Sequence, residues 1–169
     1  KYNDQGADEI VFYDIAASPV NGFVSKKWVN QIAKEVNIPF CVAGGIKSIQ
    51  DAKVILNAGA DKVSINSPAI ERPELIRELS NEFGSQCVVV GIDSLFKDDD
   101  FIVYGKTGNE KTAFNTNLKT RNWIQRVQEL GAGEIVLNCM DQDGVRNGYD
   151  IAQLKTMLRG CGIPLIASG

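Results

Sequence analysis

The chain has 169 residues, of which 44% are hydrophobic and 23% charged, and its net charge is −3. This composition is that of a globular protein with a packed core. It excludes a nucleic-acid or anionic-membrane surface, which needs a block of Lys and Arg, and a membrane span, which needs roughly 18 apolar residues in a row. No signal peptide is recognisable at the start, and we expect a cytoplasmic protein.

The chain has four cysteines and no histidine. Cys41, Cys87, Cys139 and Cys161 are widely spaced and contain no CxxC pair, so we expect buried thiols in a reducing compartment. With neither a CxxC pair nor a histidine, the chain lacks the ligand pattern of a common zinc site, and we expect no metal and no cofactor. Acid–base chemistry must therefore rest on carboxylates, Lys, Tyr, Cys or backbone groups.

Short runs of β-branched residues alternate with amphipathic stretches along the chain. The predicted strands are residues 9–14, 39–43, 61–66, 87–93, 134–139 and 163–167. The predicted helices are residues 26–36, 48–57, 71–83, 119–130 and 150–159. The strands are continuously apolar, as expected when both faces of a parallel sheet are covered. Alternation of strands and helices with short links favours an α/β fold.

One polar segment, residues 93–117, interrupts this alternation. It contains "FIVYG" followed by "KTGNEK", which predicts a β-hairpin or a similar excursion before the next helix. Loops of this length in a compact domain are usually functional. No linker or low-complexity tract divides the chain, so we expect one domain over residues 1–169.

An internal repeat narrows the fold class. "GADEIVFYD" begins at Gly6 and "GAGEIVLNC" at Gly131, while "IPF" begins at Ile38 and "IPL" at Ile163; both pairs are 125 residues apart. Such a duplication fits a (β/α)₈ TIM barrel made of two half-barrels, which needs about 250 residues. We therefore expect a truncated barrel covering about six strands, the second to the seventh. An open doubly wound sheet is the alternative.

Chemistry in a barrel lies where the strands end. Asp93 ends the most apolar strand, "CVVVGID", where a partly desolvated carboxylate suits proton transfer, although it could equally cap a loop. Asp14 holds a similar position after "IVFY". In the loop "MDQDGVRNGYD", one of Asp141 and Asp143 could orient substrate while the other serves turn geometry. The spacing resembles part of a calcium-binding loop, but the distal ligands are absent, so we expect no metal there.

Two glycine-containing strand ends, "AGGI" (43–46) and "ASG" (167–169), correspond in the repeat. Backbone N–H groups at such positions bind anions, so the pair predicts sites for the two ends of a bisphosphate. Tight packing between strand and helix is the alternative explanation for each glycine.

The motifs "IPFCVAGGIKS", "GADKVSINSPA", "GSQCVVVGID", "QDGVRNGYD" and "IPLIASG", taken in order, resemble the cyclase subunit family of imidazole glycerol phosphate synthase. The resemblance implies a (β/α)₈ barrel that forms a heterodimer with a glutaminase and receives ammonia from it. The expected reaction converts a phosphoribulosyl-formimino aminoimidazole carboxamide ribotide into imidazole glycerol phosphate and aminoimidazole carboxamide ribotide.

The resemblance also assigns residues. Asp93 matches the aspartate of the family's fifth strand, one of two acid–base residues, and the other would come from a first strand outside this chain. The positions expected to bind substrate or its phosphates are Gly45, Asn66, Ser67, Asn138, Asp143, Gly144, Ala167 and Ser168. At the opposite end of the barrel Glu9, Lys62 and Glu134 match a charged ring that gates ammonia, completed in the family by an Arg of the first strand. The alternative explanation is that each of these three residues lies in a turn before a strand, with its charge in solvent.

The chain departs from the family pattern in the segment after Asp14, where Ala16 replaces the usual Thr, and at Asn138, where many members carry Thr. Three further functions remain open: a paralogue that delivers ammonia in nucleotide-sugar modification, the barrel isomerase of the same pathway, and a non-catalytic binding module. We expect the chain alone to be inactive, and cyclase activity from it with ammonia would contradict this.

Overall fold

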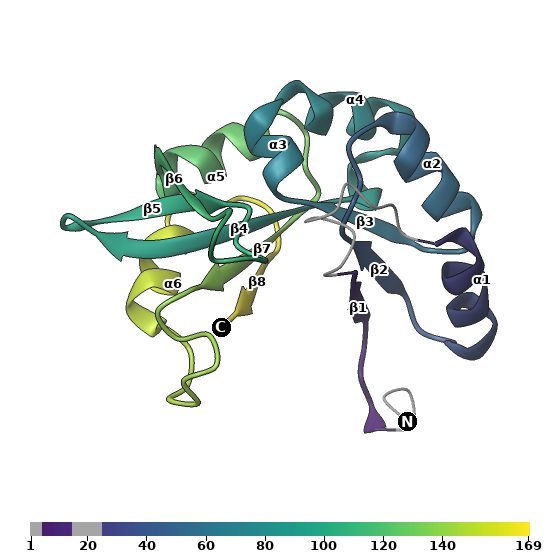
Figure 1. Cartoon of the computed structure of the whole chain (residues 1–169), viewed down its shortest axis with the longest axis horizontal. Helices are drawn as coiled ribbons and strands as arrows, with labels where there is room; N and C mark the ends of the chain where they lie inside the picture. Colours follow the sequence, from purple (N-terminus) through teal and green to yellow (C-terminus); the bar gives the residue numbers. More distant parts are fainter. Residues whose placement is uncertain (1–4, 15–24) are drawn as a thin grey trace.

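The computed structural model describes residues 5–14 and 25–169. Within them six parallel strands form one curved sheet in the order β1-β2-β3-β4-β7-β8 (Figure 1). These strands are β1 (Ile10–Tyr13), β2 (Phe40–Ala43), β3 (Lys62–Ile65), β4 (Val88–Lys97), β7 (Glu134–Cys139) and β8 (Leu165–Ser168). All six predicted strands are thereby confirmed.

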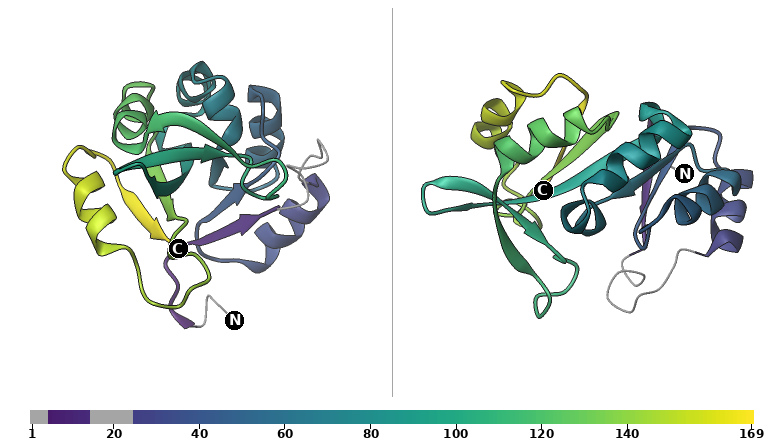
Figure 2. Two further views of the ribbon diagram at one scale, coloured as in Figure 1. Left: turned by 60° about the vertical axis from the view of Figure 1, so that its left-hand side comes forward. Right: turned by 90° about the horizontal axis from the view of Figure 1, so that it is seen from above.

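Helices connect successive parallel strands and cover the outer face of the sheet (Figure 2). They are α1 (Lys26–Glu35), α2 (Ile49–Asn57), α3 (Ser67–Glu71), α4 (Glu74–Phe83), α5 (Thr120–Glu129) and α6 (Ile151–Leu158), with a short 3₁₀ turn, η2 (Ser85–Cys87). The doubly wound alternative needs helices on both faces and does not fit. The alternating order and the curvature are those of a (β/α)₈ barrel, although no pairing joins β1 to β8 among the described residues.

The predicted repeat is visible in the pairing of the strands. Ile10 lies opposite Phe40 between β1 and β2, and Ile135 lies opposite Leu165 between β7 and β8. Each member of the second pair lies 125 residues after its counterpart, so the two half-units have the same register. This agreement supports an internal duplication more strongly than the short sequence matches do.

The predicted hairpin is confirmed, and it is longer than the sequence pattern indicated. β4 continues past Asp93 to Lys97 and pairs antiparallel with β5 (Asp100–Gly105), which pairs with β6 (Phe114–Lys119). These strands project beyond the parallel sheet (Figure 1). The loop between β5 and β6 turns back toward the ends of the parallel strands.

The single helix predicted over residues 71–83 is wrong in its first part. Two helices, α3 and α4, meet at Arg72, whose φ of −142° and ψ of 83° are not helical. A residue before proline is pushed out of the α region by the proline ring, and Pro73 follows Arg72. The Ser48 hydroxyl caps α2, because it accepts a hydrogen bond of 3.2 Å from the Asp51 N–H.

The main hydrophobic core lies between the helices and the outer face of the sheet. In α4 the side chains of Leu75, Ile76 and Leu79 are fully buried, as the predicted amphipathic pattern requires. The four cysteines are unpaired; Cys41 and Cys139 are buried, whereas Cys87 and Cys161 are only partly so. No helix in the described part of the chain is both long and apolar enough to cross a membrane.

We predict that Leu79→Ala lowers the free energy of unfolding by about 2–5 kcal/mol, because it removes a fully buried side chain and leaves a cavity. Leu158→Ala is the matched control, since that leucine is 51% exposed, and it should change stability by no more than about 0.5 kcal/mol. Urea unfolding of the purified variants measures both values. Equal effects of the two substitutions would contradict this description of the core.

Candidate functional site

A cavity of about 600 Å³ opens where the parallel strands end. Residues from β2, β3, β4, β7 and β8 line it together with the loop after β5, so that segments distant in sequence meet there. The predicted site residues that line it are Gly45, Asn66, Ser67, Asp93, Asn138, Asp143 and Ser168. Gly144 and Ala167 are not among the lining residues, and their role remains a prediction.

Asp93 is the buried acidic group of this cavity, with only 7% of its surface exposed. Three side chains donate hydrogen bonds to its carboxylate. Asn66 Nδ2 lies 2.7 Å and Thr107 Oγ1 2.5 Å from Oδ2, while Asn138 Nδ2 lies 2.9 Å from Oδ1. Hydrogen bonds to a charged group are among the stronger ones in proteins, so the carboxylate is held in one orientation.

Asn66 and Asn138 flank Asp93 from the two neighbouring strands, β3 and β7. Each uses its amide nitrogen on the aspartate, and each leaves a buried Oδ1 atom with no hydrogen-bond partner. Unpartnered buried acceptors are costly and rare.

The resemblance assigned Asn66 to a phosphate, whereas in the structure its side chain contacts Asp93, the predicted acid–base residue.

Thr107 is a site residue that the sequence did not reveal. It lies in the polar loop after β5, where no periodicity distinguishes one hydroxyl from another. Only the length of the segment indicated that the loop had a function.

The glycine-containing strand ends adopt backbone conformations that favour glycine. Gly44 has φ +116° and Gly45 φ +65°, and a Cβ on Gly44 would lie 2.5 Å from the carbonyl oxygen of Asp14. Tight packing thus explains Gly44, while Gly45 lines the cavity. The close contact of Gly44 is with the backbone of Asp14 rather than with a helix, and anion binding by Gly45 remains a prediction.

The two aspartates of the loop after β7 differ in position. Asp143 is exposed and lines the cavity. Asp141 accepts a 3.0 Å hydrogen bond from the backbone N–H of Phe96 and so ties this loop to the far part of β4. Asp143 is thus the member of the pair that faces the cavity, and its binding of substrate remains a prediction, while Asp141 bonds β4 rather than its own turn.

The structure brings Glu9, Lys62 and Glu134 together at the opposite ends of their strands. Lys62 Nζ lies 2.7 Å from Glu9 Oε2 and 2.6 Å from Glu134 Oε1, and its side chain is 16% exposed. Burial would lower the pKa of Lys62, but the hydrogen bonds to Glu134 and Glu9 outweigh burial and raise it. The second oxygen of Glu134, Oε2, is buried without a partner.

A small apolar cluster lies on the same face of the sheet as the charged cluster and the cavity: Cys41 and Val89 pair in register with Lys62 and Glu134, and Val136 lines the cavity. Cys41, Val89 and Val136 are buried there, with Val11 packed against them, apart from the main core. Burial, followed by the nearby Glu9 carboxylate, raises the pKa of Cys41, so the thiol stays protonated. The interior of the sheet thus changes from charged at one end, through apolar, to polar at the other.

The segment after Asp14, with Ala16 and the following "SPVNGF", lies outside the described residues. Asp14 itself is described: its backbone N–H donates to the carbonyl oxygen of Ala43 at 2.8 Å.

The raised pKa of Lys62 predicts a pH dependence. A lysine whose folded pKa exceeds its unfolded value of about 10.4 stabilises the fold fully below that pH, and the contribution is lost as pH rises through the folded pKa. The difference in unfolding free energy between the parent and Lys62→Met should therefore shrink above about pH 10.4. Urea unfolding of both proteins across this range measures it. A difference that grows with pH would contradict the assignment.

Comparison with known proteins adds to this geometry. The family of histidine biosynthesis proteins matches residues 1–169. Imidazole glycerol phosphate synthase subunit HisF of Pseudoalteromonas translucida (strain TAC 125) is 59% identical over 170 residues, which is 99% of this chain and 66% of that protein. The same subunit of Buchnera aphidicola subsp. Baizongia pistaciae is 58% identical over 171 residues, 100% of this chain and again 66% of the relative.

The HisF subunit of Francisella philomiragia subsp. philomiragia is also 59% identical over 169 residues, covering 100% of this chain and 66% of its own length. The chain thus spans just under two thirds of the length of these relatives, and its sequence identity to each of the three is nearly the same. With a family match over its whole length, the chain belongs to the family of histidine biosynthesis proteins.

Proposed function

We propose that the protein containing this chain is the cyclase subunit of imidazole glycerol phosphate synthase. The observation that carries the proposal is the buried Asp93 carboxylate at the strand ends, held by three donors inside a cavity of about 600 Å³. A positioned carboxylate of this kind serves as a general acid or base. The HisF names of the relatives supply the reaction.

The substrate of this reaction carries a phosphate at each end. Gly45 and Ser67 lie on the β2–β3 side of the cavity, and Asp143 and Ser168 on the β7–β8 side. We propose Gly45 and Ser67 for one phosphate and Ser168, with Gly144 and Ala167, for the other, whereas the Asp143 carboxylate would orient another part of the substrate. The shared register of the two half-units supports this assignment, because it gives the cavity two related sides on which to hold two similar groups.

Asp93 lies on β4, between these two sides, where the middle of a bound substrate would rest. Its carboxylate would accept or return a proton as ammonia is added and the imidazole ring closes. Asn66 and Asn138 would keep the carboxylate oriented during these transfers. The second acid–base residue, as the family resemblance implies, would come from the strand that precedes β1 in a full barrel.

Ammonia would enter at the other end of the sheet, past the cluster of Glu9, Lys62 and Glu134. The charges there attract and hold one another at 2.6–2.7 Å, and the apolar cluster beyond them would pass neutral ammonia while excluding ions. A glutaminase docked against this end would deliver the ammonia, and the two subunits would form a cytoplasmic heterodimer. The word "subunit" in the names of the relatives agrees with a partner of some kind.

The role of Asp93 is tested by growth rescue of a histidine auxotroph with the full-length gene. Asp93→Asn should abolish rescue and lower ammonia-dependent turnover by about 10²–10⁴-fold, the usual contribution of a general acid or base. Asp99→Asn is the matched control: it also removes one carboxylate, from an exposed residue in the β4–β5 turn whose φ of +62° asparagine tolerates. Rescue by Asp93→Asn would remove Asp93 from catalysis, and failure of the parent gene would remove the proposed function.

The role of the charged cluster is tested separately. Lys62→Ala should uncouple glutamine hydrolysis from cyclisation, because the two glutamates lose the cation that holds them, while turnover with ammonium salt should persist. Lys53→Ala is the control, since Lys53 is half exposed and forms only a 3.9 Å ion pair with Glu82. The measurement is the ratio of glutamate to imidazole glycerol phosphate formed by the complex. An unchanged ratio in Lys62→Ala would leave only a structural role for the cluster.

A further inference from the structure

The loop between β5 and β6 reaches the buried carboxylate from outside the parallel sheet. Thr107 Oγ1 donates a 2.5 Å hydrogen bond to Asp93 Oδ2, the same oxygen that accepts from Asn66. The two asparagines that contact Asp93 follow or lie within parallel strands, which fix their positions. Thr107 belongs instead to a hairpin that projects from the sheet, so its contact depends on how this loop is held.

Two contacts of the preceding residue anchor the loop. The backbone N–H of Lys106 donates to Ser67 Oγ at 2.9 Å, and Lys106 Nζ forms a 2.8 Å ion pair with Glu71 Oε1. Both partners belong to α3, the helix that follows β3. Lys106 has φ +54°, an uncommon conformation for a residue other than glycine, which the surrounding contacts maintain.

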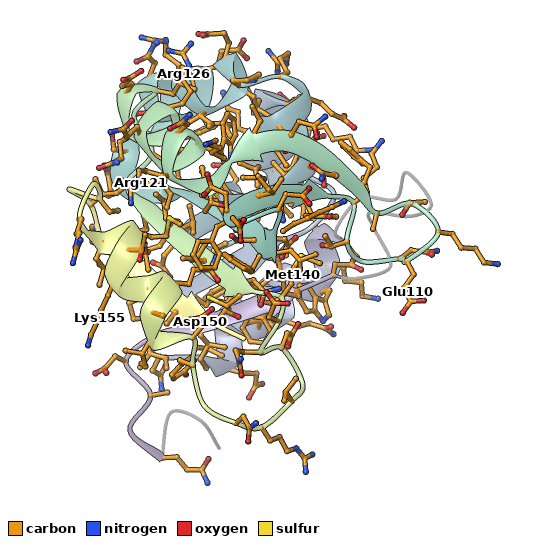
Figure 3. The ribbon with its side chains drawn as sticks, turned by 90° about the vertical axis from the view of Figure 1, so that its left-hand side faces the viewer. Glu110, Arg121, Arg126, Met140, Asp150 and Lys155 are labelled. Atoms are coloured by element: carbon orange, nitrogen blue, oxygen red, sulfur yellow. The ribbon has the colours of Figure 1, made fainter. Side chains whose placement is uncertain are left out.

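The rest of the loop faces solvent. Glu110 is exposed and extends outward from the loop, away from Met140 at the end of β7 (Figure 3). Inside the loop the Thr112 hydroxyl donates to the carbonyl oxygens of Lys106 and Asn109, each at 3.0 Å. The loop is therefore closed by its own hydrogen bonds, and the Thr107 hydroxyl is not needed to hold it together.

We propose that Thr107 is a positioning residue for Asp93, and that its hydroxyl selects the carboxylate orientation used in proton transfer. The proposal rests on the function proposed above for Asp93. Two donors share Oδ2 and approach from different segments, so the carboxylate cannot rotate about its Cβ–Cγ bond without losing a hydrogen bond. Without the hydroxyl, Asn66 alone holds that oxygen.

The β-branched threonine suits this role. Two heavy atoms on Cβ restrict its χ1 rotamers, so that the hydroxyl is already directed before substrate binds. Valine has almost the same shape and lacks the donor, whereas serine keeps the donor and loses the restriction. These two substitutions therefore separate the hydrogen bond from the packing of the side chain.

The experiment measures ammonia-dependent turnover by the full-length gene product, with the free ammonia concentration held constant across the pH range. In Thr107→Val, kcat should fall about 10- to 100-fold, the loss expected for one hydrogen bond to a charged group, with KM for the bisphosphate substrate within about twofold of the parent. The pH profile of kcat should shift as well, because the hydroxyl contacts the titrating group. Thr107→Ser should recover most of kcat.

Thr156→Val is the matched control, since it removes a hydroxyl that bonds the carbonyl oxygen of Ala152 on α6 and neither lines the cavity nor holds the β5–β6 loop. It should leave kcat and its pH profile close to those of the parent. In an Asp93→Asn background, Thr107→Val should have little further effect, because the two residues act as one unit.

Three results would overturn the proposal: equal losses in Thr107→Val and Thr156→Val, a loss in Thr107→Val that appears only in KM, or a full additional loss in the Asp93→Asn background. A crystal structure of Thr107→Val with the Asp93 carboxylate unmoved and equally ordered would also overturn it. That structure needs no turnover, so it distinguishes failure of this proposal from failure of the proposed function, which inactivity of the parent would show.

Discussion

The fixed register of the parallel strands is the constraint on which the rest of the structure depends. Each strand alternates its side chains between the two faces of the sheet, and the strands start at related heights. In β3 this alternation directs Lys62, at the start of the strand, and Ser64 to the same face. Asn66 follows directly after the strand. A shift of one residue would exchange these side chains with buried apolar ones, and both ends of the sheet would lose their polar groups together.

The two polar ends also differ in how their charges are stabilised. At one end a single ammonium lies between two carboxylates, and its raised pKa reflects these partners. At the other end one carboxylate has no cation within the contacts described for it and is held by neutral donors alone. Neutral donors stabilise the carboxylate charge without pairing it with a protein cation, so the carboxylate remains able to interact with a donor group of the substrate. Buried apolar side chains, Val89 and Val136 among them, lie on the same face of the sheet as both polar ends.

The sequence was sufficient to predict most of this arrangement, since continuous β-branched runs such as "CVVVGID" mark parallel strands and Asp93 follows directly from one. The prediction missed α3, because the predicted helix began only at residue 71, although Pro73 in the sequence already bars Arg72 from the helical region and so marks the break before α4. Nor could the sequence identify Thr107. The contact of Thr107 with Asp93 depends on the antiparallel pairing of β4 with β5, and no local pattern encodes where the loop after β5 returns. The site residues on or next to the parallel strands could therefore be predicted, whereas the residue supplied by the hairpin loop could not.

The close approach of Gly44 to Asp14 has a counterpart in the other half of the chain. A Cβ on Gly169 would lie 2.6 Å from the carbonyl oxygen of Cys139, as one on Gly44 would lie 2.5 Å from that of Asp14, and each residue of the second pair comes 125 positions after its equivalent. The nearest atom in each contact is a backbone carbonyl oxygen, so the close approach does not depend on whether residue 14 or residue 139 carries an acid or a thiol. A side chain at either glycine would push neighbouring strand ends apart. An internal duplication would therefore constrain its two halves most tightly at positions where backbone meets backbone.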